Sequence, residues 1–268
     1  MLLVTDDLAR RLEMAEAIDA AGCAEAQCNI LRDCGSEVRA IAGGVAVYCG
    51  VDSPLTHAIG IGLHGPVTVE DMEELEHFYQ HRGAPVIVDL CPHADPSLWE
   101  LLSSRGYRIV EFTNVMARSL QPDEPPPSAE SVVEVRKVEP HEEDLYVSTV
   151  VGGFFGRQDL SESELRLGST LFHMPCGASY LAFVEGQPAG GGGISIRNRV
   201  ASLYGDATNP SFRGRGVHSA LIRERVAIAQ ESGCDLVTAG TTPGSNSQRN
   251  YQKLDFQVAY TKVTLMLD

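Results

Sequence analysis

The chain repeats itself, and the repeat constrains the fold more than any other feature of the sequence. Residues 64–118 align without a gap onto residues 213–267, at an offset of 149. Glycine and apolar positions match between the copies, as Gly65 does with Gly214 and Tyr107 with Phe256. Each copy passes through a glycine turn, a helix, a short strand, a second helix and a long final strand. This shared order predicts a duplicated domain.

A proline-rich stretch separates the two copies. Residues 121–130 read QPDEPPPSAE, in which four prolines stand among polar residues. Such a composition has no apolar periodicity and is typical of a linker. We therefore predict one domain over residues 1–120, a linker over 121–130 and a second domain over 131–268. Each domain is long enough to bury a hydrophobic core of its own.

The second half predicts strands that first pair as hairpins and then alternate with helices. Alternating or short apolar runs indicate strands, and a 3.6-residue apolar spacing indicates helices. Strands are expected over residues 133–138, 178–196 (two strands), 200–208, 235–240 and 256–267, and helices over 140–151, 161–172, 217–232 and 246–254. The fold class is α/β, with a mixed, mostly antiparallel sheet flanked by helices in each domain.

The charge balance excludes two classes of partner. The chain has 36 acidic and 21 basic residues, a formal net charge of −15. Proteins that bind nucleic acid or membrane surfaces need basic patches, so neither partner is expected. The balance favours a cationic partner instead. The longest apolar run, residues 40–51, is too short and too rich in glycine to span a bilayer.

The cysteines and the N-terminus predict the compartment. The first residues become charged within a few positions and lack the apolar core of a signal peptide. None of the seven cysteines forms a CxxC pair, and free buried thiols are favoured over a metal site at Cys23, Cys28 and Cys34. Free thiols suit a reducing cytosol. We therefore expect a cytoplasmic protein that holds no metal.

One loop in the second half has the features of an anion site. Residues 211–218, SFRGRGVH, stand between an expected strand and an expected helix. A solvated turn is one interpretation. The other is an anion cradle, because a helix start offers unpaired N–H groups and the positive end of its dipole. Glycines let the backbone approach an anion closely, and Arg213 and Arg215 add charge. A nucleotide P-loop is less favoured, because Val217 and His218 do not supply its Lys and Ser or Thr.

The same loop carries a family resemblance. Residues 213–218, RGRGVH, resemble the acyl-CoA loop of GCN5-related N-acetyltransferases (GNAT), whose pattern is Arg/Gln-x-x-Gly-x-Gly/Ala. Arg213 and Gly216 match this pattern, and His218 departs from it because the sixth position is small in the family. The segments LYGDATNP and SQRNYQKLDF also resemble the family, although Asp255 stands where a glycine is usual. The resemblance is strong over residues 132–268 and weak over 37–119.

The resemblance implies a cofactor site for acetyl-CoA. The pyrophosphate would bind the backbone amides of residues 215–219, and the pantetheine arm would pair with the strand that ends near Thr208, as an added strand. On the second helix, Ser247 and Asn250 would hydrogen-bond the cofactor, or else cap the helix or lie on its surface. The residues assigned to the cofactor are Ala207, Thr208, Arg213, Gly214, Arg215, Gly216, Val217, His218, Ser219, Ser247 and Asn250.

The resemblance also implies the chemistry. An amine would attack the thioester directly, a backbone amide of the strand would hold the oxyanion, and a tyrosine would protonate the leaving thiolate. Tyr251 matches that tyrosine, and a half-buried structural aromatic is the alternative.

The base is less clearly indicated. Ser202, Tyr204, Asp206 and Thr208 share one face of a regular strand. Some family members carry a glutamate at the position of Ser202, and a serine is a poor base. Asp206 is therefore the candidate base, with His173, Glu162 or a chain of waters as alternatives.

The first half serves as an internal control. Opposite residues 213–218 it carries HGPVTV, so both arginines are missing and Pro66 has no N–H for a phosphate. Leu102 stands opposite Tyr251 and cannot donate a proton. Thr68 and Asp71 still form a helix-capping pattern. We predict that the first domain is degenerate and structural.

The glycine run at 190–193 and the reaction itself give two further expectations. The run GGGG at 190–193 precedes a strand rather than a helix, which favours a bulge or a close backbone approach over a second phosphate loop. The function that the sequence favours is transfer of an acyl group, most simply acetyl, from acyl-CoA to a primary amine. The alternative is a non-catalytic acyl-CoA sensor or scaffold.

Overall fold

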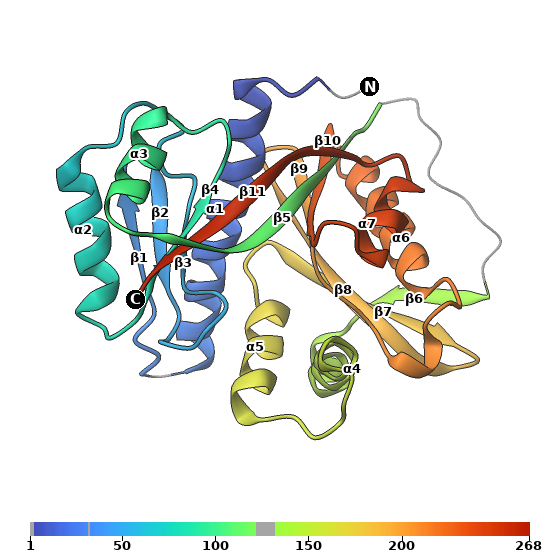
Figure 1. Ribbon diagram of the computed structural model, residues 1–268. Helices are drawn as coiled ribbons and strands as arrows, with labels where there is room; N and C mark the ends of the chain where they lie inside the picture. The colour runs from blue at the N-terminus through green and yellow to red at the C-terminus, as the bar shows by residue number, and fades with distance from the viewer. Residues whose placement is uncertain (1–2, 32, 122–131) are drawn as a thin grey trace. The chain divides into compact units, whose positions relative to one another are not determined.

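The structure is a computed structural model that describes residues 3–31, 33–121 and 132–268 (Figure 1). The chain divides into two compact units. Unit 1 comprises residues 3–115 together with 258–268, and unit 2 comprises the described part of residues 116–257. Apart from Gln121, the expected linker over 121–130 lies outside the described residues.

The units differ from the expected domains 1–120 and 131–268 at both joins. Residues 116–120 belong to unit 2, where the backbone N–H of Leu120 donates to the carbonyl of Asp235 at 2.9 Å. Residues 258–268 belong to unit 1, because strand β11 (Gln257–Leu267) pairs antiparallel with β4 (Val86–Leu90). The final strand of the second repeat therefore completes the sheet of the first.

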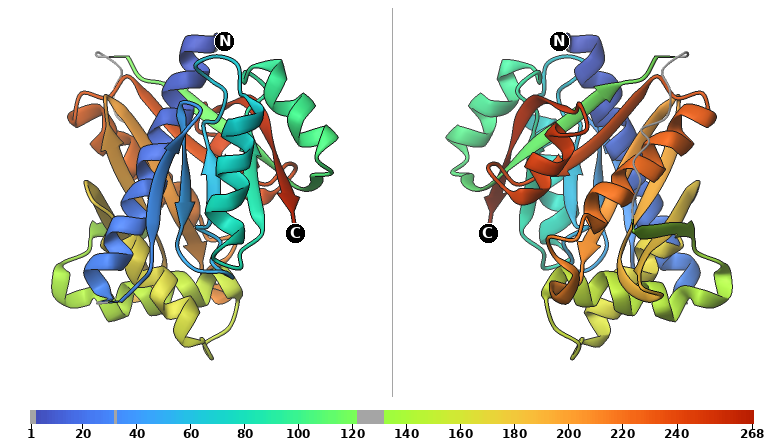
Figure 2. Two further views of the ribbon diagram at one scale, coloured as in Figure 1. Left: turned by 90° about the vertical axis from the view of Figure 1, so that its left-hand side faces the viewer. Right: turned by 90° about the vertical axis from the view of Figure 1, so that its right-hand side faces the viewer.

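Unit 1 is a mixed sheet with helices packed on it. Its strands run in the order β1-β2-β3-β4-β11-β5; β3 is parallel to β4, and the pairs β1–β2, β2–β3 and β4–β11 are antiparallel. Helices α1 and α2 both pack on β1 and β2 (Figure 2). Its further elements are α1 (Asp6–Ile30), β1 (Glu37–Ile41), β2 (Gly44–Tyr48), β3 (His57–Ile59), α2 (Val69–Gln80), α3 (Pro96–Ser104) and the first part of β5 (Arg108–Ser119).

Unit 2 repeats this plan with a longer antiparallel meander. Its strands run in the order β10-β9-β8-β7-β6, with β10 parallel to β9 and the other pairs antiparallel. Its elements are β6 (Val133–Lys137), α4 (Glu143–Phe155), α5 (Glu162–Phe172), β7 (Gly177–Val184), β8 (Gln187–Arg197), β9 (Val200–Thr208), α6 (Val217–Glu231), β10 (Leu236–Thr241) and α7 (Asn246–Gln252). The expected fold class, a mixed sheet flanked by helices, is confirmed.

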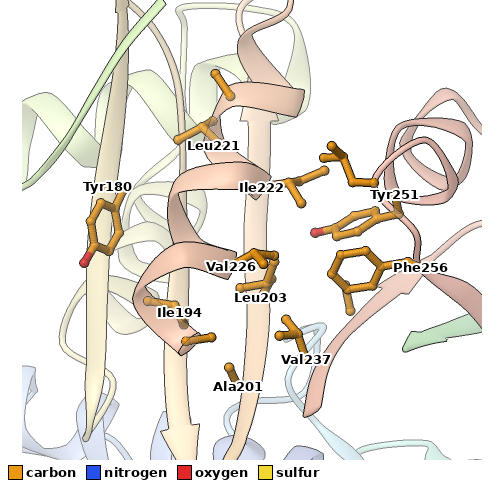
Figure 3. Packing of buried hydrophobic residues seen from close by; sticks show 14 of the residues in the cluster. Tyr180, Ile194, Ala201, Leu203, Leu221, Ile222, Val226, Val237, Tyr251 and Phe256 are labelled. Carbon is orange, nitrogen blue, oxygen red and sulfur yellow. The ribbon is translucent and has the colours of Figure 1, made fainter. Parts of the chain in front are cut away.

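Two hydrophobic clusters hold the helices of unit 2 to its sheet. Helices α6 and α7 lie on one side of β7–β9, and α4 and α5 lie on the other (Figure 1). On the first side, Leu221, Ile222 and Val226 of α6 pack among buried strand residues such as Leu203 and Val237 (Figure 3). On the second side, residues of α4 pack on β7 and β9. Burial of such side chains contributes about 25 cal/mol per Å² of apolar surface.

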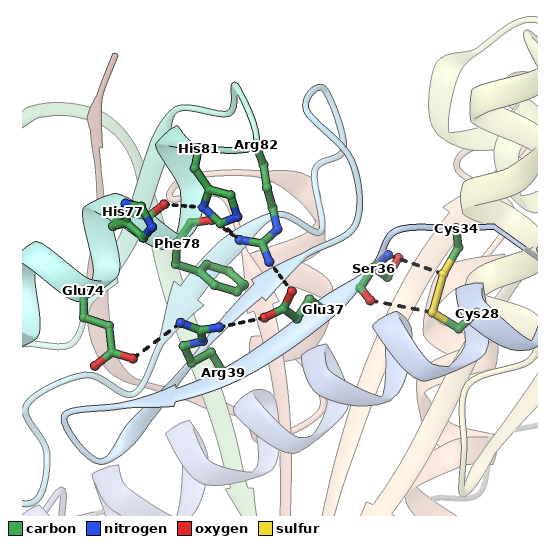
Figure 4. Close-up of polar contacts among 10 residues, drawn as sticks. All are labelled: Cys28, Cys34, Ser36, Glu37, Arg39, Glu74, His77, Phe78, His81 and Arg82. Carbon is green, nitrogen blue, oxygen red and sulfur yellow. Dashed lines mark hydrogen bonds and ion pairs between the residues drawn. A yellow bond between two sulfur atoms is a disulfide. The ribbon is translucent and has the colours of Figure 1, made fainter.

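One expectation about the cysteines is wrong. Cys28 and Cys34 form a disulfide at the end of α1, where their Cα atoms are 5.3 Å apart (Figure 4). The turn that follows the helix brings the two thiols within bonding range, which spacing alone did not reveal. The other five cysteines are free, and the described residues contain no group of His, Cys, Asp and Glu that could hold a metal. In the described part of the chain, every helix is too short or too polar to cross a membrane.

Polar side chains of β11 fix that strand within unit 1. Tyr260 donates to Glu13 Oε1 at 2.7 Å, and Lys262 Nζ lies 2.6 Å from Glu16 Oε2 and 3.7 Å from Glu13 Oε2. Thr264 donates to Asp89 Oδ1 at 2.7 Å. Burial raises the pKa of Glu13 to about 7, although the charge of Lys262 acts in the opposite direction. A carboxyl with a raised pKa takes up its proton more readily in the folded than in the unfolded chain.

This raised pKa predicts a pH-dependent stability. The contribution of Glu13 is fully present below its unfolded pKa near 4.5 and is lost as the pH rises toward 7. Between pH 4.5 and 8 the wild type should therefore lose up to about 3 kcal/mol more unfolding free energy than Glu13→Gln, whose amide does not titrate. Urea unfolding at both pH values measures this difference. Parallel pH profiles for the two proteins would contradict the assignment.

Candidate functional site

A cavity of about 790 Å³ opens at the start of α6 in unit 2. The end of α4, the end of β9, the loop before α6, the first turn of α6 and helix α7 form its walls. Asp206 lines this cavity, and so does every residue that the sequence assigned to the cofactor except Arg215. The cofactor residues that line it are Ala207, Thr208, Arg213, Gly214, Gly216, Val217, His218, Ser219, Ser247 and Asn250.

The start of α6 presents backbone N–H groups to this cavity. Gly216 is the N-cap of the helix at φ 84°, and Gly214 has φ 78°, both in the left-handed region that favours glycine. Because Gly216 has no side chain, no side-chain hydrogen bond caps the helix. The first-turn residues, Val217, His218 and Ser219, line the cavity. The first turn thus combines N–H groups that lack a side-chain cap with the positive end of the helix dipole.

The two loop arginines point to different partners. Arg213 lines the cavity, and its guanidinium donates to the carbonyl oxygens of Thr208 and Gly153, both at 3.4 Å. Arg215 pairs with Glu185 at 2.6 Å and is not among the residues that line the cavity. Both arginines were expected to add charge to the anion cradle, but of the two only Arg213 lies at the cavity. Glu185 competes for Arg215 from the turn between β7 and β8.

The glycine run at 190–193 lets buried side chains approach β8. The register of β8 and β9 shifts between Gly191 and Gly193, so the expected bulge is confirmed. A Cβ at Gly192 would lie 2.3 Å from Asp206 Oδ1 and 2.7 Å from Arg225 Nη1. A Cβ at Gly193 would meet the ring of Tyr204 at 2.3 Å. Any side chain at these positions would displace Asp206 and Arg225 or the ring of Tyr204.

The bulge also changes which face of β9 each side chain occupies. Gly205 has φ 64°, and the regular alternation of the strand breaks there. Tyr204 donates to the carbonyl of Leu171 in α5, whereas Asp206 contacts α6 on the other side of the sheet. The expectation that Tyr204 and Asp206 share one face is therefore wrong. Side chains alternate with a period of two only in a regular strand, and the bulge interrupts that period.

Asp206 is the centre of a buried polar network. It pairs with Arg225 of α6, which is 0% exposed and also donates to the Gly193 carbonyl at 2.7 Å. Tyr251 donates to Asp206 Oδ2 at 2.5 Å. His218 Nε2 lies 3.0 Å from the same oxygen.

Asn250 extends this network on the other side of the His218 ring. Its side-chain amide lies 3.1 Å from His218 Nδ1. If the Asn250 amide donates to Nδ1, then Nε2 is the ring nitrogen that donates to Asp206.

The electrostatics of this network oppose the two catalytic roles first assigned. Burial alone would raise the pKa of Asp206, but the charge of Arg225 and the hydrogen bonds from His218 and Tyr251 hold that pKa well below its ordinary value. Such a carboxylate is a poor base at neutral pH. Burial and the charge of Asp206 raise the pKa of Tyr251 well above its ordinary value. Tyr251 is 1% exposed, does not line the cavity, and points its hydroxyl at Asp206.

The remaining candidate bases lie elsewhere. His173 Nε2 is 2.9 Å from Glu143, and Glu162 pairs with Arg166 at 3.0 Å on the surface of α5. Neither candidate lines the cavity.

Sequence reasoning missed Arg225. It is an arginine one turn after Leu221, within the apolar stripe of α6. A charged residue on a buried helix face signals a buried partner, and this signal was available in the sequence.

Residues 142–256 match the acetyltransferase (GNAT) family. This segment is a GNAT domain. No curated protein matches the chain. Two solved structures share the fold over nearly the whole chain at 20% identity. A GCN5-related N-acetyltransferase from Kribbella flavida has a TM-score of 0.66 and covers 92% of this chain and 95% of its own. Another, from Sphaerobacter thermophilus, has a TM-score of 0.60 and covers 94% and 91%.

A third solved structure is itself described as a tandem protein. It is the tandem GNAT protein from the clavulanic acid biosynthesis pathway, with a TM-score of 0.52 at 14% identity, covering 70% of this chain and 65% of its own. This similarity in fold is consistent with a duplicated arrangement of this chain.

The buried ion pair predicts the consequence of removing one partner. Arg225→Met leaves the Asp206 carboxylate buried without its counter-charge, which should lower the unfolding free energy by about 3–5 kcal/mol. Adding Asp206→Asn should recover much of the loss, since the remaining partner is then neutral. Arg223→Met, two residues earlier on α6 and only half-buried, is the control and should change stability by less than about 0.5 kcal/mol. Chemical denaturation of the three variants measures the effect; equal losses for Arg223→Met and Arg225→Met would contradict it.

Proposed function

We propose that the cavity binds an acyl-CoA and that the protein transfers its acyl group, acetyl in the simplest case, to a primary amine. The observation that carries the proposal is the start of α6, where a first turn without a side-chain cap opens on a cavity that Arg213 also lines. Backbone N–H groups, a helix dipole and a guanidinium together form a site for a pyrophosphate.

The edge of β9 suits the pantetheine arm. β9 pairs with β10 only over residues 200–203, whereas it pairs with β8 as far as Thr208. The backbone of residues 205–208 would therefore pair on the β10 side with the amides of an arm that adds like a strand. Ala207 and Thr208 on this edge line the cavity.

The reaction needs few side chains. The amine nitrogen attacks the thioester carbon, the C–N bond forms, the C–S bond breaks, and the thiolate leaves. A backbone N–H on the free edge of β9 would stabilise the oxyanion, because it is fixed before the reaction begins. A protonated amine would lose one proton before it attacks and a second after the C–N bond forms, and both would pass to water, since the lowered pKa of Asp206 makes it a poor acceptor. A thiolate is a stable leaving group, so the thiolate departs without a proton from Tyr251.

The charge of the chain favours a cationic acceptor. A net charge of −15 attracts cations, which favours a protonated amine as the acceptor in its resting form.

Unit 1 keeps the fold of the helix start but lacks the reactive residues. Its helix α2 begins at a capping box that Thr68 and Asp71 form. Leu102, which occupies the position that Tyr251 has in unit 2, is buried in the core of unit 1. We propose that unit 1 is a structural domain. We also propose, on the five free cysteines and against the Cys28–Cys34 disulfide, that the protein acts in the cytoplasm.

A specific observation supports the alternative, an acyl-CoA sensor without turnover. Asp206 and Tyr251, the two side chains that could exchange protons with the substrates, are hydrogen-bonded to each other. A sensor would bind acetyl-CoA and release no free CoA with any amine. An enzyme releases CoA only when an acceptor amine is present, and thiol detection across a panel of amines distinguishes the two.

The loop arginines provide a matched pair for the binding site. Arg213→Ala should weaken the binding of acetyl-CoA by about tenfold, the loss expected for one charge-assisted contact to phosphate. Arg215→Ala removes the same side chain two residues away, but Arg215 pairs with Glu185 outside the cavity, so its Kd should stay within about twofold of the wild type. Isothermal titration measures both. Equal losses in the two variants would indicate a diffuse charge effect and refute the site.

Tyr251 separates two mechanisms. If its hydroxyl only completes the network around Asp206, Tyr251→Phe should retain acetyl-CoA binding and lose less than about tenfold in kcat. A general acid typically contributes 10²–10⁴-fold, so a loss of about a hundredfold or more with unchanged binding would restore the acid role. Steady-state rates with the best amine of the panel, together with a titration of each protein, decide between them.

A further inference from the structure

The channel along β9 has a defined inner end. β9 and β10 are paired up to Leu203 and Ala239, and the part of β9 that extends beyond this pairing toward the cavity comprises residues 205–208. The start of α6, where the phosphates are proposed to bind, lines the same cavity as residues 206–208. A ligand that holds its phosphates at α6 would therefore extend any attached arm along residues 208 to 205.

His218 joins the two walls of this channel. Its Nε2 lies 3.0 Å from Asp206 on β9, and its Nδ1 lies 3.1 Å from the side-chain amide of Asn250 on α7. The ring also packs edge-on against Tyr251, with the centroids 5.4 Å apart. The side chain is 14% exposed and lines the cavity. Both ring nitrogens are bonded, so the imidazole is held between β9 and α7.

We propose that His218 is a specificity-determining residue that bars the channel behind the phosphate cradle. The inference rests on the proposed function, because it concerns the arm of the same ligand. An adenosine nucleotide that carries the phosphates of coenzyme A but no arm binds in front of the bar. A ligand with a pantetheine arm binds only after the His218 side chain leaves Asp206 and Asn250. The bar thereby weakens the binding of arm-bearing ligands relative to arm-less ones.

The His218 side chain can leave its position without leaving the Asp206 carboxylate unpaired. When His218 leaves, Asp206 keeps the ion pair with Arg225 and the hydrogen bond from Tyr251. The cost of opening is therefore confined to two hydrogen bonds of the imidazole and its contact with the Tyr251 ring. Removing the imidazole removes this cost, and the cradle residues Arg213 and Gly216 are left untouched. For the same reason we expect His218→Ala to fold.

Two ligands and one variant test the bar. Acetyl-CoA carries the arm, and 3′-phosphoadenosine 5′-diphosphate carries the same nucleotide and phosphates without it. His218→Ala should bind acetyl-CoA about tenfold tighter than the wild type, while its affinity for the arm-less nucleotide stays within about twofold. Isothermal titration of both proteins with both ligands gives the four constants. His218→Ser, which keeps a small polar side chain in the first turn, is the second variant and should behave in the same way.

Each outcome separates this inference from the proposed function. An equal change for both ligands in both variants, or weaker binding of acetyl-CoA alone, contradicts the bar while leaving the acyl-CoA site in place. Arg213→Ala is the matched control, because it should weaken both ligands equally by acting on the phosphates. If neither the wild type nor either His218 variant binds either ligand, the proposed function fails and the inference fails with it.

Discussion

The ion pair between Asp206 and Arg225 determines the shape of unit 2 around its cavity. Arg225 is fully buried, and its guanidinium reaches both Asp206 and the carbonyl of Gly193. The pair fits only because Gly192 has no side chain and because the bulge at Gly205 turns Asp206 toward α6. A buried ion pair contributes little net stability, but the loss of one partner is costly. The pair therefore selects one arrangement of β8, β9 and α6.

This arrangement explains why the site presents backbone groups and few reactive side chains. Asp206 accepts hydrogen bonds from Tyr251 and His218, so these three polar side chains near the cavity are hydrogen-bonded to one another. The groups left to a ligand are the first-turn amides of α6, Arg213 and the free edge of β9. These are binding and orienting groups. In the proposed reaction, positioning and a fixed oxyanion donor would therefore supply the rate enhancement, and both act without a titrating side chain.

Much of the fold could be predicted from the sequence, because the repeat and the turn glycines are local signals. The start of α6 and the loop before it follow from glycine and the apolar stripe, and the structure places them as expected. The pairing of β11 with β4 in unit 1 could not be predicted from the repeat. Its cause is the pairing of Tyr260, Lys262 and Thr264 with groups in residues 13–89, which are remote in sequence. The alternating polar residues of this strand were a signal that its face meets polar partners.

The sequence predicted which residues lie at the candidate site, but not where their side chains point or which partners they contact. Loop composition identified Arg213 and Arg215 alike, but the partner of Arg215 comes from a turn thirty residues earlier. The faces of β9 followed from a period of two that a single bulge at Gly205 overturns. Side-chain roles depend on such contacts, so the roles of Asp206 and Tyr251 could not be read from their positions in the pattern.

Amide hydrogen exchange with and without acetyl-CoA reports directly on the backbone groups that are proposed to hold the ligand. We expect acetyl-CoA to slow exchange at residues 216–219 and along 205–208, and to leave the corresponding segment 64–70 of unit 1 unchanged. Arg213→Ala should reduce this protection at the same ligand concentration. Unchanged exchange at the start of α6 under saturating acetyl-CoA would contradict the claim that this helix holds the cofactor.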